Sequence, residues 1–369
     1  MMRLSPLLSL YIGRSFLRAF LSALGTMMGL VLLFDIIELL RRSATHGGAA
    51  FELIVELALL KLPQMMELIL PFAVMVGAMA CLWSLTRSRE LVVARSSGVS
   101  AWQFLAPLLV AALVIGAINV TSFNPLAAVL YQKFERLQDQ LALRGTDNPL
   151  LVGEGGLWLR ENHGNEQMVV HANAVRQERY VLKMRDVTVY ITDDVGRFLY
   201  RVDGALAELR DGAIHLSEAR IMRPGESVTR QDTYSFPTEL TLARIQDNFA
   251  SPETISFWDL PGFIRFFESA GFSASRQRLY FQSLLASPLL LCGMVLVAAA
   301  FSVTPNLRSG GTLIRLVGAA GAGFTFYFFS KVVYALGMSA TLPVSLAAWT
   351  PPLMTGLASV GALFHLEDG

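Results

Sequence analysis

Few residues in this chain of 369 can carry catalytic or redox chemistry. It has only two cysteines, Cys81 and Cys292, and both lie within apolar runs. The five histidines are scattered, so no pair has the spacing of a metal site, and no Gly-x-Ser-x-Gly nucleophile elbow occurs. We therefore expect both cysteines to be core residues rather than a disulfide, and we expect no cofactor.

Lysine is also rare, and its positions exclude a nucleotide-binding loop. Such a loop needs a Gly-Lys pair that opens a helix, so that backbone N–H groups and the lysine hold the phosphates. None of the lysines follows a glycine; they are Lys61, Lys133, Lys183 and Lys331. We expect the chain not to be an enzyme, and any ATP hydrolysis it uses would belong to a separate protein.

Charged residues make up 16% of the chain and hydrophobic residues 53%, which places it in the membrane class. The net charge of +1 comes without any basic cluster interleaved with aromatic residues, so nucleic acid is not an expected partner. Runs of about 20 apolar residues, the length that crosses a bilayer, occur six times. They cover residues 16–40, 68–85, 101–123, 279–302, 313–337 and 343–364.

Between the third and fourth runs lies a polar block, about residues 131–250, in which apolar and polar residues alternate as in half-buried strands. The apolar positions of this pattern include Val187, Val189, Ile191, Phe198, Tyr200, Val202, Ile214 and Leu216. Turns are predicted at the Asp-Gly pairs 203–204 and 211–212. Several short strands at this spacing favour a small antiparallel sandwich or jelly-roll.

The predicted fold is therefore an α-helical membrane protein with six transmembrane helices and an inserted all-β, jelly-roll-like domain. Residues 1–130 form the first three spans, residues 131–255 the β domain, and residues 256–369 an amphipathic helix followed by the last three spans. Ser256 and Asp259 resemble a capping box for that amphipathic helix, at about 256–270. Whether it lies on the membrane surface or beneath the β domain stays open.

Arginine distribution predicts the orientation, because basic residues favour the cytoplasmic side. More of the arginines flanking the spans fall on the side shared by both termini than on the other side. The first group is Arg3, Arg14, Arg18, Arg87, Arg89, Arg95, Arg308 and Arg315, and the second is Arg41, Arg42, Arg276 and Arg278. We expect cytoplasmic termini and a periplasmic β domain.

Residues 86–100 form a short charged segment between the second and third spans. Ser88 can cap a helix, Glu90 sits in its first turn, and Gly98 can end it, which gives a helix at about 87–98. One interpretation is a basic turn that only fixes the topology. The other is an element that a partner protein binds, because a short helix between two spans transmits force to both of them.

Arg41, Arg42 and Lys331 are the candidate substrate-binding residues, because cations near a membrane surface are costly and tend to be functional. Arginine forks suit phosphate geometry, so Arg41 and Arg42 could bind a glycolipid head group. The alternative is local pairing with Glu38, three and four residues earlier on the same helix face. For Lys331, snorkelling to the membrane surface is a sufficient explanation.

Three motifs, taken together, resemble one protein family. The string SRELVVARSSGVS at the charged segment, the opening YIGRSFLRAF and the closing LPVSLAAWTPPL are similar to the lipopolysaccharide export permeases of the LptF/LptG (YjgP/YjgQ) family. The resemblance runs in order along nearly the whole chain. Within the family, FDIIELLRR and LAAWTPPL are more similar to the LptG branch than to the LptF branch.

The resemblance implies a permease in the bacterial inner membrane that extracts lipopolysaccharide and passes it to a periplasmic bridge of LptC and LptA. It implies a heterodimer with an LptF-type permease and a dimer of an LptB-type ATPase that binds the charged segment. The coupling residues carried over from the family motif are Arg89, Glu90, Leu91, Arg95 and Gly98. Two rival functions stay open: a permease of another ATP-driven lipid or lipoprotein export complex, and a membrane scaffold without transport.

Overall fold

The chain separates into two compact units in the computed structural model. The helical unit comprises Met1–Gln138, Glu253–Leu260 and Ser275–Gly369, and the second unit comprises Asp139–Pro252 and Pro261–Ala274. The structure describes residues 6–45, 51–88, 90, 100–142, 150–153, 156–163, 166–178, 181–193, 197–210, 212–238, 251–269, 272–302, 312–339 and 341–368.

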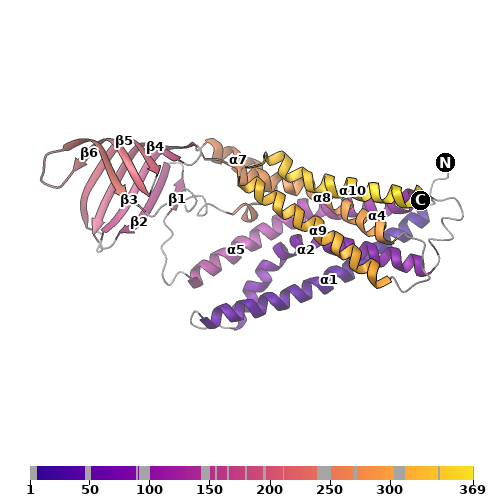
Figure 1. Ribbon diagram of the computed structural model, residues 1–369. Helices are drawn as coiled ribbons and strands as arrows, with labels where there is room; N and C mark the ends of the chain where they lie inside the picture. Colours follow the sequence, from indigo (N-terminus) through magenta and orange to yellow (C-terminus); the bar gives the residue numbers. More distant parts are fainter. Residues whose placement is uncertain are drawn as a thin grey trace. The chain divides into compact units, whose positions relative to one another are not determined.

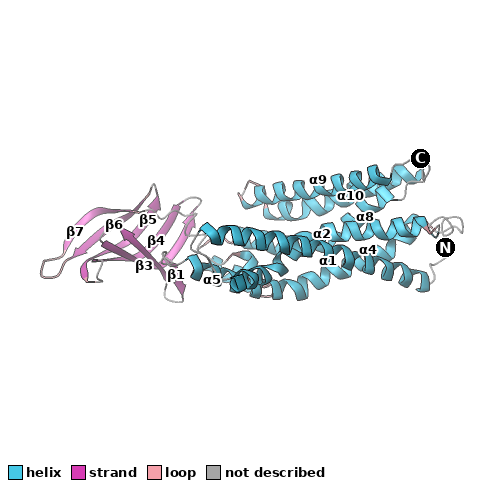
Figure 2. Cartoon of the chain, turned by 90° about the horizontal axis from the view of Figure 1, so that it is seen from below, coloured by secondary structure: helices cyan, strands magenta, loops and turns pink. Residues whose placement is uncertain are grey.

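Long helices make up the apolar part of the chain, as predicted (Figures 1 and 2). They are α1 (Pro6–Thr45), α2 (Phe51–Arg87), α4 (Ala101–Ile118), α5 (Asn124–Ala142), α8 (Ser275–Ser302), α9 (Thr312–Met338) and α10 (Val344–Asp368). A π-helix, η1 (Asn119–Phe123), joins α4 to α5, so the third span and the start of the polar block form one continuous run of helix. The first described strand begins only at Leu150.

Among the described residues, five helices are long and apolar enough to cross a membrane, one fewer than the six predicted. The sixth predicted span is α10, which is helical over 25 residues but is not one of the five. Its apolar character is diluted by Trp349, Thr350, Pro351 and Pro352. The predicted architecture of apolar helices with an inserted β domain is confirmed.

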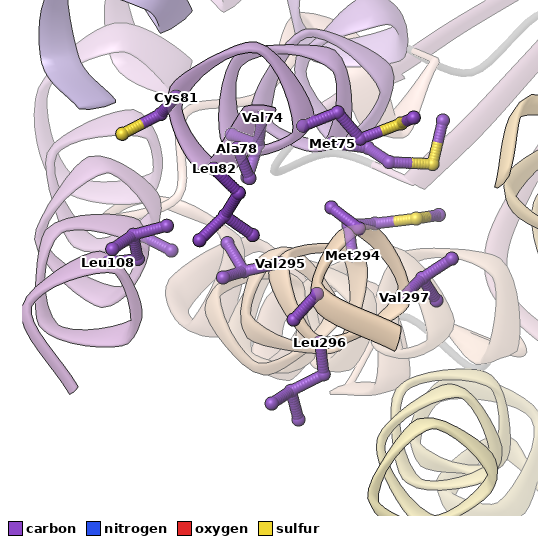
Figure 3. Close-up of a cluster of buried hydrophobic side chains, with 14 of the residues drawn as sticks. Val74, Met75, Ala78, Cys81, Leu82, Leu108, Met294, Val295, Leu296 and Val297 are labelled. Atoms are coloured by element: carbon purple, nitrogen blue, oxygen red, sulfur yellow. The ribbon is translucent and has the colours of Figure 1, made fainter. Parts of the chain in front are cut away.

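The core of the helical unit lies around α2 and α8, whose most apolar windows are each 67% buried. Figure 3 shows Leu82 of α2 and Val295 of α8 pointing toward one another, with Leu108 of α4 beside them. Cys81 and Cys292 are buried in these two helices and unpaired, which confirms them as core residues.

The β unit contains a single antiparallel sheet of seven described strands (Figure 1). They are β1 (Leu150–Gly153), β2 (Gly156–His163), β3 (Glu166–Glu178), β4 (Val181–Asp193), β5 (Phe198–Arg210), β6 (Ala213–Met222) and β7 (Thr229–Pro237). Each strand pairs with the next, so the described order is a meander. A jelly-roll has strands that pair out of sequence order, whereas each described strand here pairs with its sequence neighbour.

The alternation predicted the buried face of this sheet well. Val187, Val189 and Ile191 of β4 are all nearly inaccessible, as are Ile214 and Leu216 of β6. In β5 the alternation also predicted Phe198 and Val202 to be buried. Val202 is buried, but Phe198 is exposed. A register shift between β4 and β5 occurs beside Phe198, so the strand's first residue leaves the pattern.

One of the two predicted turns was wrong. Gly212 has a φ of 73°, as expected of a glycine that lets the chain turn between β5 and β6. Asp203 and Gly204 instead lie in the middle of β5. At Gly204 a Cβ would come within 3.0 Å of the Leu216 side chain, so this glycine allows close packing across the sheet rather than a turn.

The capping box predicted before the amphipathic helix is present in part, because the Asp259 carboxylate bonds the Ser256 hydroxyl instead of the Ser256 backbone N–H. Ser256 Oγ donates to Asp259 Oδ2 at 2.6 Å, and the Asp259 backbone N–H donates to Ser256 Oγ at 3.3 Å. A 3₁₀ turn, η2 (Pro252–Thr254), precedes it, and helix α7 (Leu260–Ser269) follows. The placement of α7 at the membrane surface stays a prediction.

Candidate functional site

The C-terminal end of α1 carries the two arginines predicted to bind phosphate. Arg41 donates from Nε and Nη2 to the two carboxylate oxygens of Glu38, at 2.9 and 3.0 Å, and Arg42 Nε donates to Glu38 Oε1 at 2.8 Å. The pairing considered from the sequence therefore exists. However, one carboxylate serves two guanidinium groups whose side chains are 74% and 64% exposed, so an accessible positive charge remains. Phosphate binding stays a prediction.

Asp35, one turn earlier in α1, is not part of this cluster. Its Oδ1 lies 2.5 Å from Lys61 Nζ of α2, and that ammonium lies 5.8 Å from the centroid of the Phe134 ring in α5. Both charged side chains are largely buried. These three residues tie α1, α2 and α5 together, a connection that the sequence analysis missed because Asp35 and Lys61 are 26 residues apart.

Lys331 lies in α9, with its Nζ 5.4 Å from the centroid of the Tyr327 ring. It lines a cavity of about 310 Å³ between α2, α8, α9 and α10, to which Glu253 also contributes. Arg41 and Arg42 do not line this cavity. The structure thus brings Arg41 and Arg42 together but does not bring Lys331 into the same site within one chain.

Asn124, at the start of α5, is the centre of a hydrogen-bond network beside this cavity. Its Nδ2 donates to Glu67 Oε1 of α2 and to Tyr280 Oη of α8, both at 3.0 Å. Its Oδ1 accepts the backbone N–H of Phe257 at 2.9 Å. One residue, 1% exposed, therefore fixes two membrane helices and the segment that leads back from the β domain.

The π-helix before Asn124 takes part in the same attachment. The carbonyl oxygen of Thr121 in η1 accepts a hydrogen bond from Trp258 Nε1 at 3.1 Å. A π-helix is rare and often occurs at functional positions. The sequence analysis had no signal for it, since residues 119–123 read only as the end of an apolar run.

Two helices expose most of their apolar surface, in contrast to α2 and α8. The most apolar window of α1 is 6% buried and that of α9 is 17% buried. Phe34 and Leu30 of α1 and Phe324 and Phe328 of α9 are among the large side chains left exposed. Such faces meet either lipid or the helices of another protein.

The coupling residues Arg89, Leu91, Arg95 and Gly98 lie outside the described residues. Glu90 is described: it is exposed, and Tyr11 Oη of α1 lies 3.4 Å from its Oε1.

The predicted cap at Ser88 stays a prediction, because most of the helix expected at 87–98 lies outside the described residues. The backbone N–H of Ser88 donates to the Ser84 carbonyl and its hydroxyl to the Leu85 carbonyl, so Ser88 extends the hydrogen bonding of α2. On the other side of the segment, Ser100 and Gln103 form a capping box that starts α4.

The sequence model of the lipopolysaccharide export system permease family LptF/LptG matches residues 10–365. The chain belongs to this family. It is also 25% identical over 360 residues to the lipopolysaccharide export system permease protein LptG of Haemophilus influenzae, covering 93% of this chain and 94% of the relative. It is 24% identical over 367 residues to the LptG of Escherichia coli K12, covering 97% and 95%.

The LptF/LptG match extends from α1 to α10 and includes the β insertion. Together with the membrane-length apolar helices, membership identifies a multi-pass protein of the inner membrane whose β domain is periplasmic. The chain is a transporter subunit rather than an enzyme.

Proposed function

We propose that the chain is an LptG-type permease subunit that extracts lipopolysaccharide from the inner membrane and passes it to a periplasmic bridge. The observation that carries this proposal is the family match over residues 10–365, which spans the helical unit and the β insertion together. The similarity to two proteins named LptG, at over nine-tenths coverage of each chain, supports the choice of branch.

Membership of this family implies a separate LptB-type ATPase dimer that hydrolyses ATP. The chain itself has no Gly-Lys pair for a nucleotide-binding loop. The exposed Glu90 lies three residues after the end of α2, the helix at the centre of the core. A partner that moves the segment after Arg87 therefore pushes on a helix packed against α1 and α8. Tightly packed helices transmit such a displacement rather than absorb it.

An LptF-type permease completes the lipid path. The exposed apolar faces of α1 and α9 provide the surface that a second subunit or a lipid acyl chain would cover. Arg41 and Arg42, at the end of α1, supply a positive charge for phosphates of the lipid. The periplasmic β domain then takes part in transfer to LptC and LptA.

The test is reconstitution. The full chain is expressed with LptF-, LptB- and LptC-type partners, placed in liposomes with lipopolysaccharide, and ATP-dependent crosslinking of the lipid to a soluble LptA-type acceptor is measured. We expect crosslinking that needs both ATP and this chain. A complex with ATPase activity but no transfer would indicate another exported lipid or lipoprotein. Failure to recover any ATPase would favour a scaffold.

A further inference from the structure

The cavity that Lys331 lines contains hydrogen-bond acceptors that the described part of the chain leaves without donors. Asn119 of η1 is 5% exposed, and its Oδ1 is buried and has no partner among those residues. Gln64 Oε1 of α2 is also buried without a hydrogen-bond partner among the described residues, and Gln64 lines the same cavity. Buried acceptors are nearly always bonded, so these two oxygens call for a donor that enters the cavity.

Carboxylates add to this acceptor character. Glu67 lines the cavity, and its Oε1 already accepts from Asn124. Glu253, from the segment after the β domain, lines it too. Lys331 is the basic residue of the lining, and its Nζ lies over the Tyr327 ring. Carboxylates among apolar helices need a positively charged partner, which a bound cation could supply.

The cavity lies near the ends of the helices that face the periplasm. Tyr280 is five residues from the start of α8, and Lys331 is seven residues from the end of α9. At 1.5 Å per residue these positions lie only about 8 and 10 Å inside the helix ends. That depth is where the head groups of outer-leaflet lipids meet their acyl chains.

We propose that this cavity binds the phosphoethanolamine head group of a glycerophospholipid. The ammonium donates to Gln64, Glu67 and Asn119, and the phosphate pairs with Lys331. A primary ammonium has three N–H donors, the chemistry that the orphaned acceptors lack. A choline group has no N–H donor, and the uncharged glycerol group of phosphatidylglycerol carries no cation for the two carboxylates. The site lies within one subunit and does not depend on the proposed function.

The experiment is native mass spectrometry of the full chain in mild detergent, titrated with phosphatidylethanolamine, phosphatidylcholine or phosphatidylglycerol that have identical acyl chains. We expect phosphatidylethanolamine to bind about tenfold more tightly than the other two, as expected for charge-assisted hydrogen bonds. Glu67→Gln keeps the acceptor for Asn124 but removes the charge, and should abolish the preference. Lys331→Met should weaken binding of all three lipids about tenfold.

Matched controls are Glu56→Gln in α2 and Lys133→Met in α5, both exposed and outside the cavity lining. They should bind as the unmodified chain does. Thermal unfolding without lipid checks that each variant is folded. Added phosphatidylethanolamine should raise the unfolding temperature of the unmodified chain more than that of Glu67→Gln, which should respond equally to the three lipids.

Equal affinity for the three lipids, or a preference that survives Glu67→Gln, would overturn the site. If the chain binds phosphoethanolamine-modified lipid A but not phosphatidylethanolamine, a phospholipid is not the occupant. The phosphoethanolamine group would then come from the exported glycolipid. Absence of lipopolysaccharide transfer in the reconstituted complex would bear on the proposed function and leave these binding results unchanged.

Discussion

Lys61 Nζ in α2 lies 2.5 Å from Asp35 Oδ1 in α1, and the two side chains are 24% and 13% exposed. The other carboxylate oxygen of Asp35 is buried with no hydrogen-bond partner within the described ranges. Lys61 is therefore the partner that the structure shows for this carboxylate. Because α1 buries little of its apolar surface, this polar contact contributes to its attachment to α2.

We expect Lys61→Met to lower the free energy of unfolding by about 1–3 kcal/mol, because the largely buried Asp35 carboxylate would lose this partner. Denaturant unfolding of the purified chain in mild detergent measures the change. Lys133→Met, on an exposed position of α5, is the control and should stay within about 0.5 kcal/mol. Adding Asp35→Asn to Lys61→Met should restore part of the loss. A loss no greater than that of the control would show that the pair does not stabilise the fold.

At Gly77 in α2 the backbone of α1 comes very close. A methyl group there would lie 2.6 Å from Phe20 Cα of α1. We expect Gly77→Ala to destabilise the chain by about 1–3 kcal/mol, since the two helices would have to separate. Gly25→Ala in α1 has nothing within 4 Å and should be neutral or slightly stabilising, because alanine favours helix. The same unfolding measurement compares them, and equal effects would contradict the packing argument.

Composition and periodicity predicted the order of the elements because both are local properties of the chain. The run at residues 68–85, which became the second half of α2, is almost entirely apolar. The alternation at Val187, Val189 and Ile191 directly marks one face of β4. The contact between Ser256 and Asp259 was predictable for the same reason, since these residues are three positions apart.

Contacts between distant residues could not be predicted in this way. Asn124 bonds Glu67 and Tyr280 across 57 and 156 residues, and nothing in the pattern around it indicates a partner. The π-helix is likewise in contact with a residue far away in the sequence, since its Thr121 carbonyl accepts a hydrogen bond from Trp258. At Gly204 a local signal gave a false prediction. An Asp-Gly pair is typical of a turn, but this glycine lies within β5 and packs against the Leu216 side chain.

Glu90 is the only acidic residue in the charged segment 86–100, and it is exposed in the isolated chain. We expect Glu90→Lys to leave the permease folded and inserted but to reduce the amount of ATPase recovered with it in a pull-down. If Glu90 enters a basic groove of the ATPase, reversing its charge costs roughly 3–5 kcal/mol of binding free energy.

Tyr11→Phe serves as the control for this change. It removes the 3.4 Å contact between Tyr11 and Glu90 without altering the charge, and should leave ATPase recovery nearly unchanged. Full recovery of the ATPase with Glu90→Lys would exclude Glu90 as a coupling contact.

The arrangement of Glu38, Arg41 and Arg42 allows the two explanations of the arginines to be separated by a charge change in each direction. One carboxylate balances only one of the two guanidinium groups.

If the arginines bind lipid phosphates, replacing both with glutamine should reduce the lipopolysaccharide that co-purifies with the assembled complex by roughly tenfold or more. Glu38→Gln should then raise it, because both guanidinium groups lose the carboxylate that competes with phosphate. If the arginines only pair with Glu38 at the surface, none of the three substitutions should change the bound lipid, since exposed pairs contribute little. Quantifying lipid A in the purified complex distinguishes the outcomes, and opposite effects of the two variants are the result that a surface pair cannot produce.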